Sequence, residues 1–196
     1  MPLILAHRGA CWEVPENTLE AFELAIAEEA DYVEFDVRAR NGELVICHDP
    51  GPPADVPSLD EILAALTGRV GLCVEVKEEE TADAVLEALE AHRARPEELI
   101  VVSFQAAALE TVARRRPEVR CVLHTNDPAL AERFWGIGLE EPTTTARVED
   151  AQARGLETTV FTVNEPERML ELGALGVTGI FTVRPALARR TLQAAR

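Results

Sequence analysis

The stretch LILAHRGACWEVPENT (residues 3–18) introduces the pattern that the rest of the chain repeats. Leu3–Ala6 is an apolar run that is too short for a core helix and is bounded by a glycine, so it predicts a buried strand. Gly9 lets the backbone turn or approach a ligand closely. Asn17 or Thr18 can cap the helix that follows. The first unit is therefore expected to be a strand, a loop and a helix.

Strand-like and helix-like segments alternate along the whole chain. Eight strands and eight helices in strict alternation favour an α/β fold of the TIM (β/α)₈ barrel type over a doubly wound sheet. The sixth strand has the weakest pattern, so a weak or irregular strand is expected there. The predicted strands cover residues 3–6, 32–37, 72–76, 99–103, 120–123, 137–139, 158–163 and 179–182, and the predicted helices cover residues 19–28, 59–66, 81–91, 107–114, 128–134, 146–153, 165–172 and 185–194.

One further strand lies outside this alternation. Glu43–Cys47 follows the turn signal RNGE (40–43) and is expected to form a hairpin with the second barrel strand. The chain has 196 residues, of which 47% are hydrophobic, and can bury one sizeable core. Residues 1–196 are therefore expected to form a single domain.

The formal net charge of −16 limits the partners that the protein could bind. Nucleic acids and anionic membranes would be repelled, whereas a small phosphorylated substrate is compatible with this charge where local cations or a metal offset the field. No stretch is long enough to span a bilayer and no signal peptide is recognisable, so we expect a cytoplasmic protein. The four cysteines show no paired spacing and are expected to be free thiols.

Lysine is used at a single position. The chain has 19 basic residues, and all of them except Lys77 are arginine. A lone lysine suggests a position that needs a compact ammonium group rather than a planar guanidinium. Chance is the alternative, but the neighbours of Lys77 make chance less attractive.

Two strands carry charged side chains that alternate with apolar ones. In YVEFDV, Glu34 and Asp36 face the same side, and in LCVEVK, Glu75 and Lys77 do so. The apolar residues between them would face the helices, which places the charges inside the barrel near the active-site end. Converging carboxylates repel one another, and an all-oxygen set suits Mg²⁺, Ca²⁺ or Mn²⁺ rather than zinc. The alternative is a set of buried salt bridges with Lys77 and Arg8.

Two of the four histidines fall at loop mouths on the expected active face. His7 ends the first strand and His48 ends the hairpin, where Asp49 can orient its ring. One imidazole can take up a proton while the other donates one. With a divalent cation and nearby basic groups, this pair suits displacement at phosphorus. His92 and His124 are expected to be structural or solvated.

A series of short motifs runs along the chain: HRGA (7–10), PENT (15–18), E-x-D (34–36), HD (48–49), E-x-K (75–77), SF (103–104), TVN (162–164) and GVTGIFT (176–182). In this order and spacing, these motifs resemble those of the glycerophosphodiester phosphodiesterase family. The resemblance implies a TIM barrel that hydrolyses glycerophosphodiesters to sn-glycerol 3-phosphate and an alcohol.

The resemblance also implies a role for individual residues, by position. One histidine would deprotonate the attacking hydroxyl and the other would protonate the leaving alcohol. Attack by a glycerol hydroxyl through a cyclic phosphate and direct attack by water are both consistent with the residues. The implied roles are divalent metal binding for Glu34, Asp36 and Glu75, acid/base catalysis for His7 and His48, and substrate or phosphate binding for Arg8, Lys77 and Phe161.

Three departures from the family pattern stand out. The segment that often follows the HD motif and covers the substrate is missing, because the next predicted helix begins at Leu59. Phe161 occupies a position where the family usually has tryptophan, and either ring can pack on substrate. Val183 replaces the aspartate of the late T-D-x-P motif, which bears on local support of the site.

Other functions remain open at this point. A phospholipase-C-like or lysophospholipase-D-like enzyme would need an exposed apolar rim, for which Trp12, Val14, Phe134 and Trp135 are the candidates. A non-catalytic barrel that binds phosphate esters would be indicated by a missing histidine or carboxylate, and none is missing. A metal-dependent amidohydrolase is disfavoured because no H-x-H motif follows the first strand.

Overall fold

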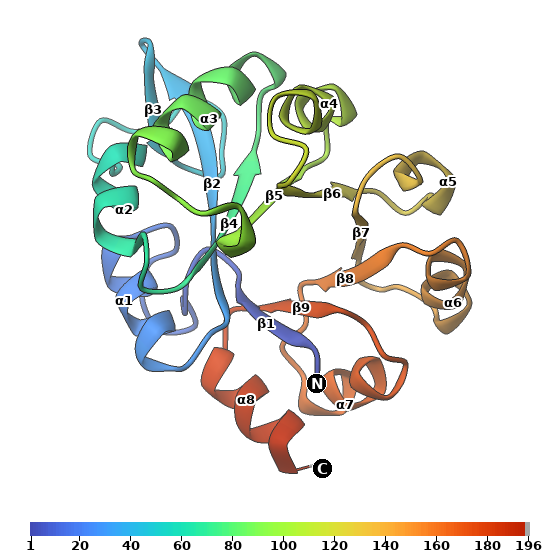
Figure 1. The fold of residues 1–196 in the computed structure, drawn as a ribbon. Coiled ribbons are helices and arrows are strands. Elements are labelled where there is room, and N and C mark those ends of the chain that lie inside the picture. Colours follow the sequence, from blue (N-terminus) through green and yellow to red (C-terminus); the bar gives the residue numbers. More distant parts are fainter. Residues whose placement is uncertain (195–196) are drawn as a thin grey trace.

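A computed structural model describes residues 1–194 as a barrel of parallel strands surrounded by helices (Figure 1). In the described chain the barrel strands are β1 (Leu3–Ala6), β2 (Tyr32–Arg40), β4 (Gly71–Val76), β5 (Leu99–Ser103), β6 (Arg120–His124), β7 (Gly136–Glu140), β8 (Glu157–Phe161) and β9 (Gly179–Thr182). The barrel is closed because β1 pairs with both β2 and β9. This arrangement confirms the predicted TIM barrel.

Helices pack around the outside of the barrel (Figure 1). They are α1 (Leu19–Ala27), α2 (Leu59–Leu66), α3 (Ala82–Ala91), α4 (Ala106–Arg115), α5 (Pro128–Ala131), α6 (Thr145–Ala153), α7 (Pro166–Ala174) and α8 (Pro185–Ala194), with short 3₁₀ turns at Glu79–Thr81 and Pro96–Glu98. α5 is shorter than the predicted helix over 128–134. Its continuation is replaced by a tighter turn, in which the backbone N–H of Phe134 donates a 2.8 Å hydrogen bond to the Ala131 carbonyl. β8 ends at Phe161 rather than at the predicted Val163. Within residues 1–194, no helix has both the length and the apolar character needed to cross a membrane.

The sixth barrel strand, β7, is continuous despite its weak sequence pattern. Gly136 and Gly138 cause that weakness, since glycine has a low strand propensity. Both glycines allow close contacts: a Cβ on Gly136 would lie 2.4 Å from the Glu157 carbonyl oxygen, and one on Gly138 would lie 2.3 Å from Cδ2 of His124. β7 pairs with both β6 and β8, so the ring of strands is unbroken there.

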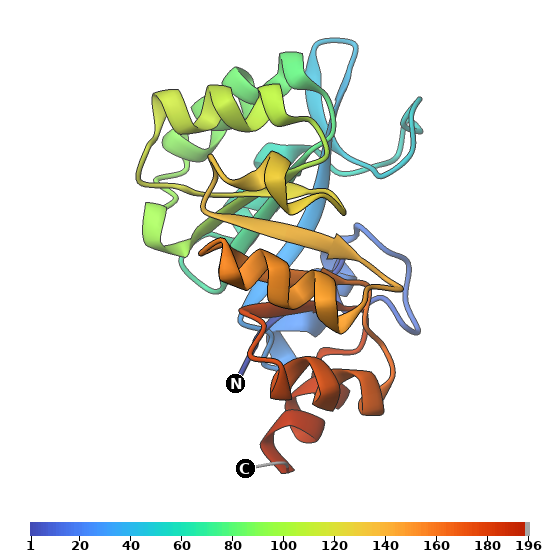
Figure 2. The same ribbon diagram turned by 90° about the vertical axis from the view of Figure 1, so that its right-hand side faces the viewer.

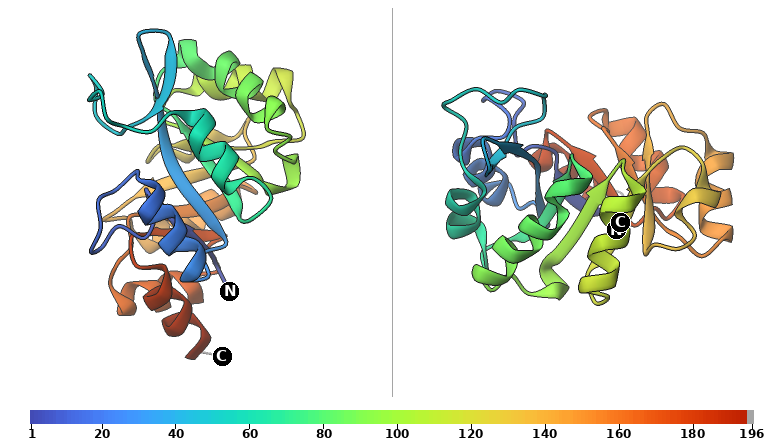
Figure 3. Two further views of the ribbon diagram at one scale, coloured as in Figure 1. Left: turned by 90° about the vertical axis from the view of Figure 1, so that its left-hand side faces the viewer. Right: turned by 90° about the horizontal axis from the view of Figure 1, so that it is seen from above.

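The predicted hairpin is present and extends beyond the barrel. β3 (Glu43–Ile46) runs antiparallel to β2, with Val37 opposite Ile46. Figures 2 and 3 show this hairpin projecting past the barrel, and in Figure 2 the β1–α1 loop lies at the end toward which the β7 arrow points. The hairpin therefore brings His48, which follows β3, to the C-terminal mouth of the barrel.

The alternation along the barrel strands separates two environments. Val33, Phe35 and Val37 of β2 belong to the apolar layer between the strands and the helices, as predicted. Glu34 and Asp36 point the other way, into the barrel. A second apolar cluster fills the barrel interior and consists of Leu5, Tyr32, Cys73, Ile100, Val102, Val122, Phe161 and Phe181. The interior is thus filled largely by apolar side chains.

Candidate active site

Three carboxylates meet at the C-terminal mouth of the barrel. Glu34 and Asp36 come from β2 and Glu75 from β4, where Asp36 and Glu75 are register partners. One oxygen of each carboxylate lies within 4.8 Å of the others. All three residues are buried, with at most 4% of their surface exposed. The structure therefore brings together the three residues for which the sequence predicts metal binding.

The carboxylates differ in their partners. Asp36 lies 3.2 Å from both Arg8 Nε and Lys77 Nζ. Glu75 accepts a 2.8 Å hydrogen bond from Lys77. Oε2 of Glu34 accepts a 2.8 Å hydrogen bond from the Arg8 backbone N–H, but Oε1 is buried without a hydrogen-bond partner among residues 1–194. Salt bridges alone thus account for Asp36 and Glu75 but leave one oxygen of Glu34 unexplained.

Burial and mutual repulsion shift the pKa values of this cluster. Burial, followed by the charges of Asp36 and Glu75, raises the pKa of Glu34 well above its usual range. Burial and Asp36 raise the pKa of Glu75 to about 7. Burial would also raise the pKa of Asp36, but the adjacent Lys77 and Arg8 charges and a hydrogen bond hold it below its usual range. Carboxylate oxygens are the ligands that hard divalent cations prefer, so the unpartnered oxygen and the repulsion both fit such an ion.

The β1–α1 loop is held in place by close packing on α1. Gly9 has a φ of 88°, and a Cβ there would lie 2.6 Å from Cβ of Ala21. Thr18 caps α1 by accepting a 3.2 Å hydrogen bond from the Ala21 N–H, which resolves the choice of cap. Asn17 instead donates a 2.8 Å hydrogen bond to Asp36. This packing holds the two residues before the glycine, a histidine and an arginine, at the mouth.

The two predicted histidines line one cleft of about 200 Å³. Nδ1 of His7 lies 3.1 Å from the Thr162 hydroxyl. Nδ1 of His48 lies 2.8 Å from Oδ1 of Asp49, as expected for a carboxylate that orients the ring. Burial, followed by the charge of Arg8, lowers the pKa of His7 to about 4, so this imidazole is uncharged at neutral pH.

Sequence reasoning missed part of the cleft. Phe104, His124, Glu140, Thr162 and Phe181 line it together with the predicted residues, which include Phe161, Arg8 and Lys77. His124 was expected to be structural or solvated; instead it is a buried wall of the cleft. Phe104, Thr162 and Phe181 lie in the motifs SF, TVN and GVTGIFT, to which no site role had been given. For His124 and Glu140 the available signal was position, because they are the last residues of β6 and β7.

Two of the four candidates for an apolar rim lie elsewhere. Phe134 is buried in the outer apolar layer. Trp135 precedes β7 and lies close to Arg120, the first residue of β6, so it is at the N-terminal end of the barrel. Trp12 is 57% exposed in the β1–α1 loop. The expectation that Phe134 and Trp135 border the mouth is therefore wrong.

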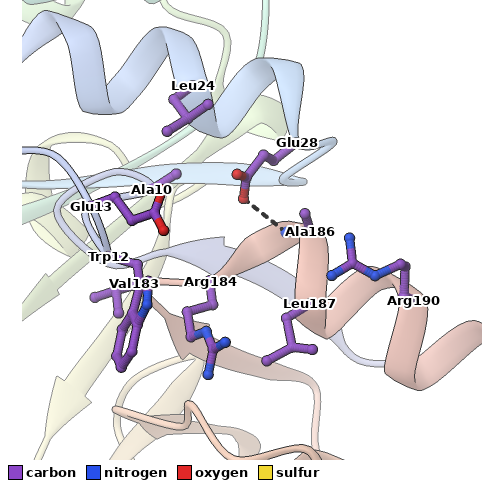
Figure 4. Close-up of a pocket in the computed structure, with 10 residues that line it drawn as sticks. All are labelled: Ala10, Trp12, Glu13, Leu24, Glu28, Val183, Arg184, Ala186, Leu187 and Arg190. Carbon is purple, nitrogen blue, oxygen red and sulfur yellow. Dashed lines mark hydrogen bonds between the residues drawn. The ribbon is translucent and has the colours of Figure 1, made fainter.

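A second cavity of about 260 Å³ lies between the β1–α1 loop and α8 (Figure 4). The Arg184 guanidinium lies 4.4 Å from the centre of the Trp12 ring, and Figure 4 shows Val183 beside the same ring.

Oδ1 of Asn164 accepts hydrogen bonds from the Thr182 hydroxyl at 3.0 Å and from the Val183 N–H at 3.1 Å. The segment after β9 is thus tied to the loop after β8 without the aspartate that Val183 replaces.

Comparison with known proteins identifies relatives over nearly the whole chain. The family model "Glycerophosphoryl diester phosphodiesterase family" matches residues 7–69 and 53–187. A glycerophosphodiester phosphodiesterase of Bacillus subtilis is 25% identical over an alignment of 247 positions, which covers 94% of this chain and 84% of that protein. An uncharacterized Bacillus subtilis protein is 28% identical over an alignment of 243 positions, which covers 98% of this chain and 99% of that protein.

Solved structures show the same fold. A phosphodiesterase of Oleispira antarctica in complex with the product sn-glycerol-3-phosphate has a TM-score of 0.87 at 26% identity, covering 98% of this chain and 97% of its own. A glycerophosphodiester phosphodiesterase of Parabacteroides distasonis has a TM-score of 0.89 at 20% identity, covering 99% and 98%. The alignments with the two Bacillus subtilis proteins span 247 and 243 positions, more than the 196 residues of this chain. Both of those proteins therefore carry segments that this chain lacks.

Proposed function

The chain belongs to the glycerophosphoryl diester phosphodiesterase family and is an enzyme of that family; we propose that it hydrolyses glycerophosphodiesters to sn-glycerol 3-phosphate and an alcohol, with a divalent cation and two histidines. The observation that carries the proposal is the placement of His7 and His48 on the same cleft as Glu34 and Glu75. The product complex of the Oleispira antarctica relative supports the choice of substrate class.

Glu34, Asp36 and Glu75 would hold the cation, since their oxygens converge within 4.8 Å. Bound there, a divalent cation would offset negative charge on the phosphate oxygens. Arg8 and Lys77 face the same cluster and supply fixed positive charge beside the phosphate. These cations make the mouth able to accept a phosphodiester although the protein as a whole is strongly acidic.

His7 and His48 divide the proton transfers. The uncharged imidazole of His7 can accept the proton of the attacking hydroxyl as the new oxygen–phosphorus bond forms. His48, whose ring is oriented by Asp49, then gives a proton to the leaving alcohol as its bond to phosphorus breaks. The attacking hydroxyl is either the neighbouring glycerol hydroxyl, with water opening the cyclic phosphate afterwards, or water itself.

The test is turnover of glycerophosphocholine and glycerophosphoethanolamine by the purified protein, with released glycerol 3-phosphate as the readout. Reactions would contain Mg²⁺, Ca²⁺, Mn²⁺ or EDTA. We expect cation-dependent release that His48→Ala reduces at least 100-fold. His92→Ala is the matched control, because His92 follows α3 and is bound to Asp60 away from the cleft. Absence of release with every cation from a folded protein would refute the proposal.

A further inference from the structure

The cleft has two chemically different sides. The acidic cluster and its cations come from β1, β2 and β4, whereas the strands on the other side of the closed ring are β6, β7 and β8 (Figure 1). That second side presents the rings of His124 and Phe161, stacked with centroids 4.4 Å apart. A phosphodiester whose phosphate contacts the charged side can therefore place one of its two organic parts against this aromatic side.

Of the polar side chains that line the cleft on the aromatic side, His124 is the most buried. It is 5% exposed, and neither ring nitrogen has a hydrogen-bond partner within residues 1–194. Phe104 and Phe181 approach the ring edge-to-face at 5.1 and 5.7 Å. Gly138 makes room for it, since a Cβ there would lie 2.3 Å from Cδ2 of the ring. A buried imidazole with both nitrogens unpaired is unfavourable unless something that enters the cleft pairs with it.

The state of the ring indicates the kind of partner. Burial, followed by the charge of His7, lowers the pKa of His124 to about 3, so the ring is uncharged. An uncharged imidazole offers one N–H donor and one acceptor nitrogen, and either of them can pair with a hydroxyl group, which is itself a donor and an acceptor. The negatively charged phosphate is instead attracted to the positive charges of Arg8 and Lys77 on the opposite side.

We propose that His124 is a substrate-binding residue that hydrogen-bonds the terminal hydroxyl of the substrate's glycerol moiety, while the Phe161 ring packs against the glycerol carbons. This proposal rests on the proposed function. Burial within the cleft decides between the two organic parts of the substrate: His124 is 5% exposed, whereas Phe104, 55% exposed, and the exposed Glu140 border the opening. The small glycerol moiety would contact the buried His124, and the variable alcohol would extend toward the opening.

The first test pairs a change in the protein with a change in the substrate. Wild type and His124→Leu would be assayed with glycerophosphocholine and with an analogue that carries hydrogen in place of the terminal glycerol hydroxyl. In wild type we expect removal of the hydroxyl to lower kcat/KM by about 10- to 100-fold. In His124→Leu the same removal should change kcat/KM less than about 3-fold, because the partner is already gone. Equal losses in the two proteins would overturn the proposal.

Two further variants guard against a merely structural effect. Gly138→Ala keeps the imidazole but displaces it, and should also reduce discrimination between the two substrates. His124→Asn retains a donor and an acceptor and should discriminate between the two substrates better than His124→Leu does. His92→Leu makes the same change at a distant histidine and should behave as wild type. Circular dichroism verifies that each protein is folded, and unaltered discrimination in folded Gly138→Ala counts against the proposal.

Equilibrium binding separates this proposal from the proposed function. Calorimetric titration with glycerol 3-phosphate in Mg²⁺ needs no turnover. We expect His124→Leu, but not His92→Leu, to weaken binding about 10-fold or more. If wild type hydrolyses neither substrate yet shows this binding difference, the proposed function fails and the subsite stands. Binding that is unchanged by His124→Leu overturns the subsite, whatever the activity.

Discussion

Replacing Glu75 with glutamine should change how stability depends on pH when no divalent cation is present. The folded protein raises the pKa of Glu75 from 4.5 to about 7, chiefly through burial and the charge of Asp36. Between these values the folded state binds more protons than the unfolded chain, so stability falls as pH rises. For this single group, the free energy of unfolding drops by about 2.5 kcal/mol from pH 5 to pH 8. Glutamine at this position cannot ionise and removes the effect.

The assay is thermal unfolding followed by circular dichroism in EDTA at pH 5 and pH 8. Histidines with lowered pKa values, His7 and His124, act in the opposite direction below about pH 6.5, so the quantity to compare is the difference between wild type and Glu75→Gln. The Tm of the variant minus the Tm of wild type should be about 5–10 °C larger at pH 8 than at pH 5. Mg²⁺ at pH 8 should raise the Tm of wild type more than that of the variant.

A matched control is Glu43→Gln, because the Glu43 side chain is 73% exposed. It should shift the Tm equally at the two pH values. If Glu75→Gln behaved in the same way, the carboxylate would not be held under repulsion in the folded protein. The inference of a divalent cation site from buried charge would then lose its energetic basis.

Three other changes follow from single contacts. Gly9→Ala should lower the free energy of unfolding by at least about 2 kcal/mol in urea titrations, since the new Cβ would lie 2.6 Å from Cβ of Ala21 at a φ of 88°. Lys77→Met should lower it by about 3 kcal/mol in EDTA, because Asp36 and Glu75 would lose a buried partner, and should reduce kcat/KM at least 100-fold. His7→Gln should flatten the loss of stability on acidification from pH 6.5 to pH 4, a span worth about 3 kcal/mol for this group, in Tm measurements across that range.

The barrel could be predicted because its signals are local. Each strand is a short apolar run, each helix follows within a few residues, and their alternation leaves few topologies. The orientation of Glu34 and Asp36 followed from the two-residue period of a strand, and it placed them opposite Val33, Phe35 and Val37. The parallel register then aligned Asp36 with Glu75. The two-residue periodicity of the strands was thus sufficient to predict the acidic cluster.

The weaker predictions concern segments where contacts distant in sequence outweigh local propensity. Gly136 and Gly138 argue against a strand, yet β7 forms between β6 and β8, and the glycines fit against Glu157 and His124. The predicted helix over 128–134 continues only to Ala131. For β7 the deciding contacts come from the neighbouring strands, which a propensity scale does not contain.

His124 shows the limit most clearly. A histidine at the end of a strand is compatible with solvent, with a structural hydrogen bond or with a ligand, and its own neighbours in sequence do not choose among them. Barrel closure makes the choice, by placing Phe161 against one face, Gly138 at one edge and no hydrogen-bond partner from residues 1–194 at either nitrogen. Acidic residues on adjacent strands can be anticipated from their periodicity. The opposite side of the cleft depends on which strands face each other across the ring, so only the folded chain shows that the ring nitrogens of a buried histidine there have no partner among residues 1–194.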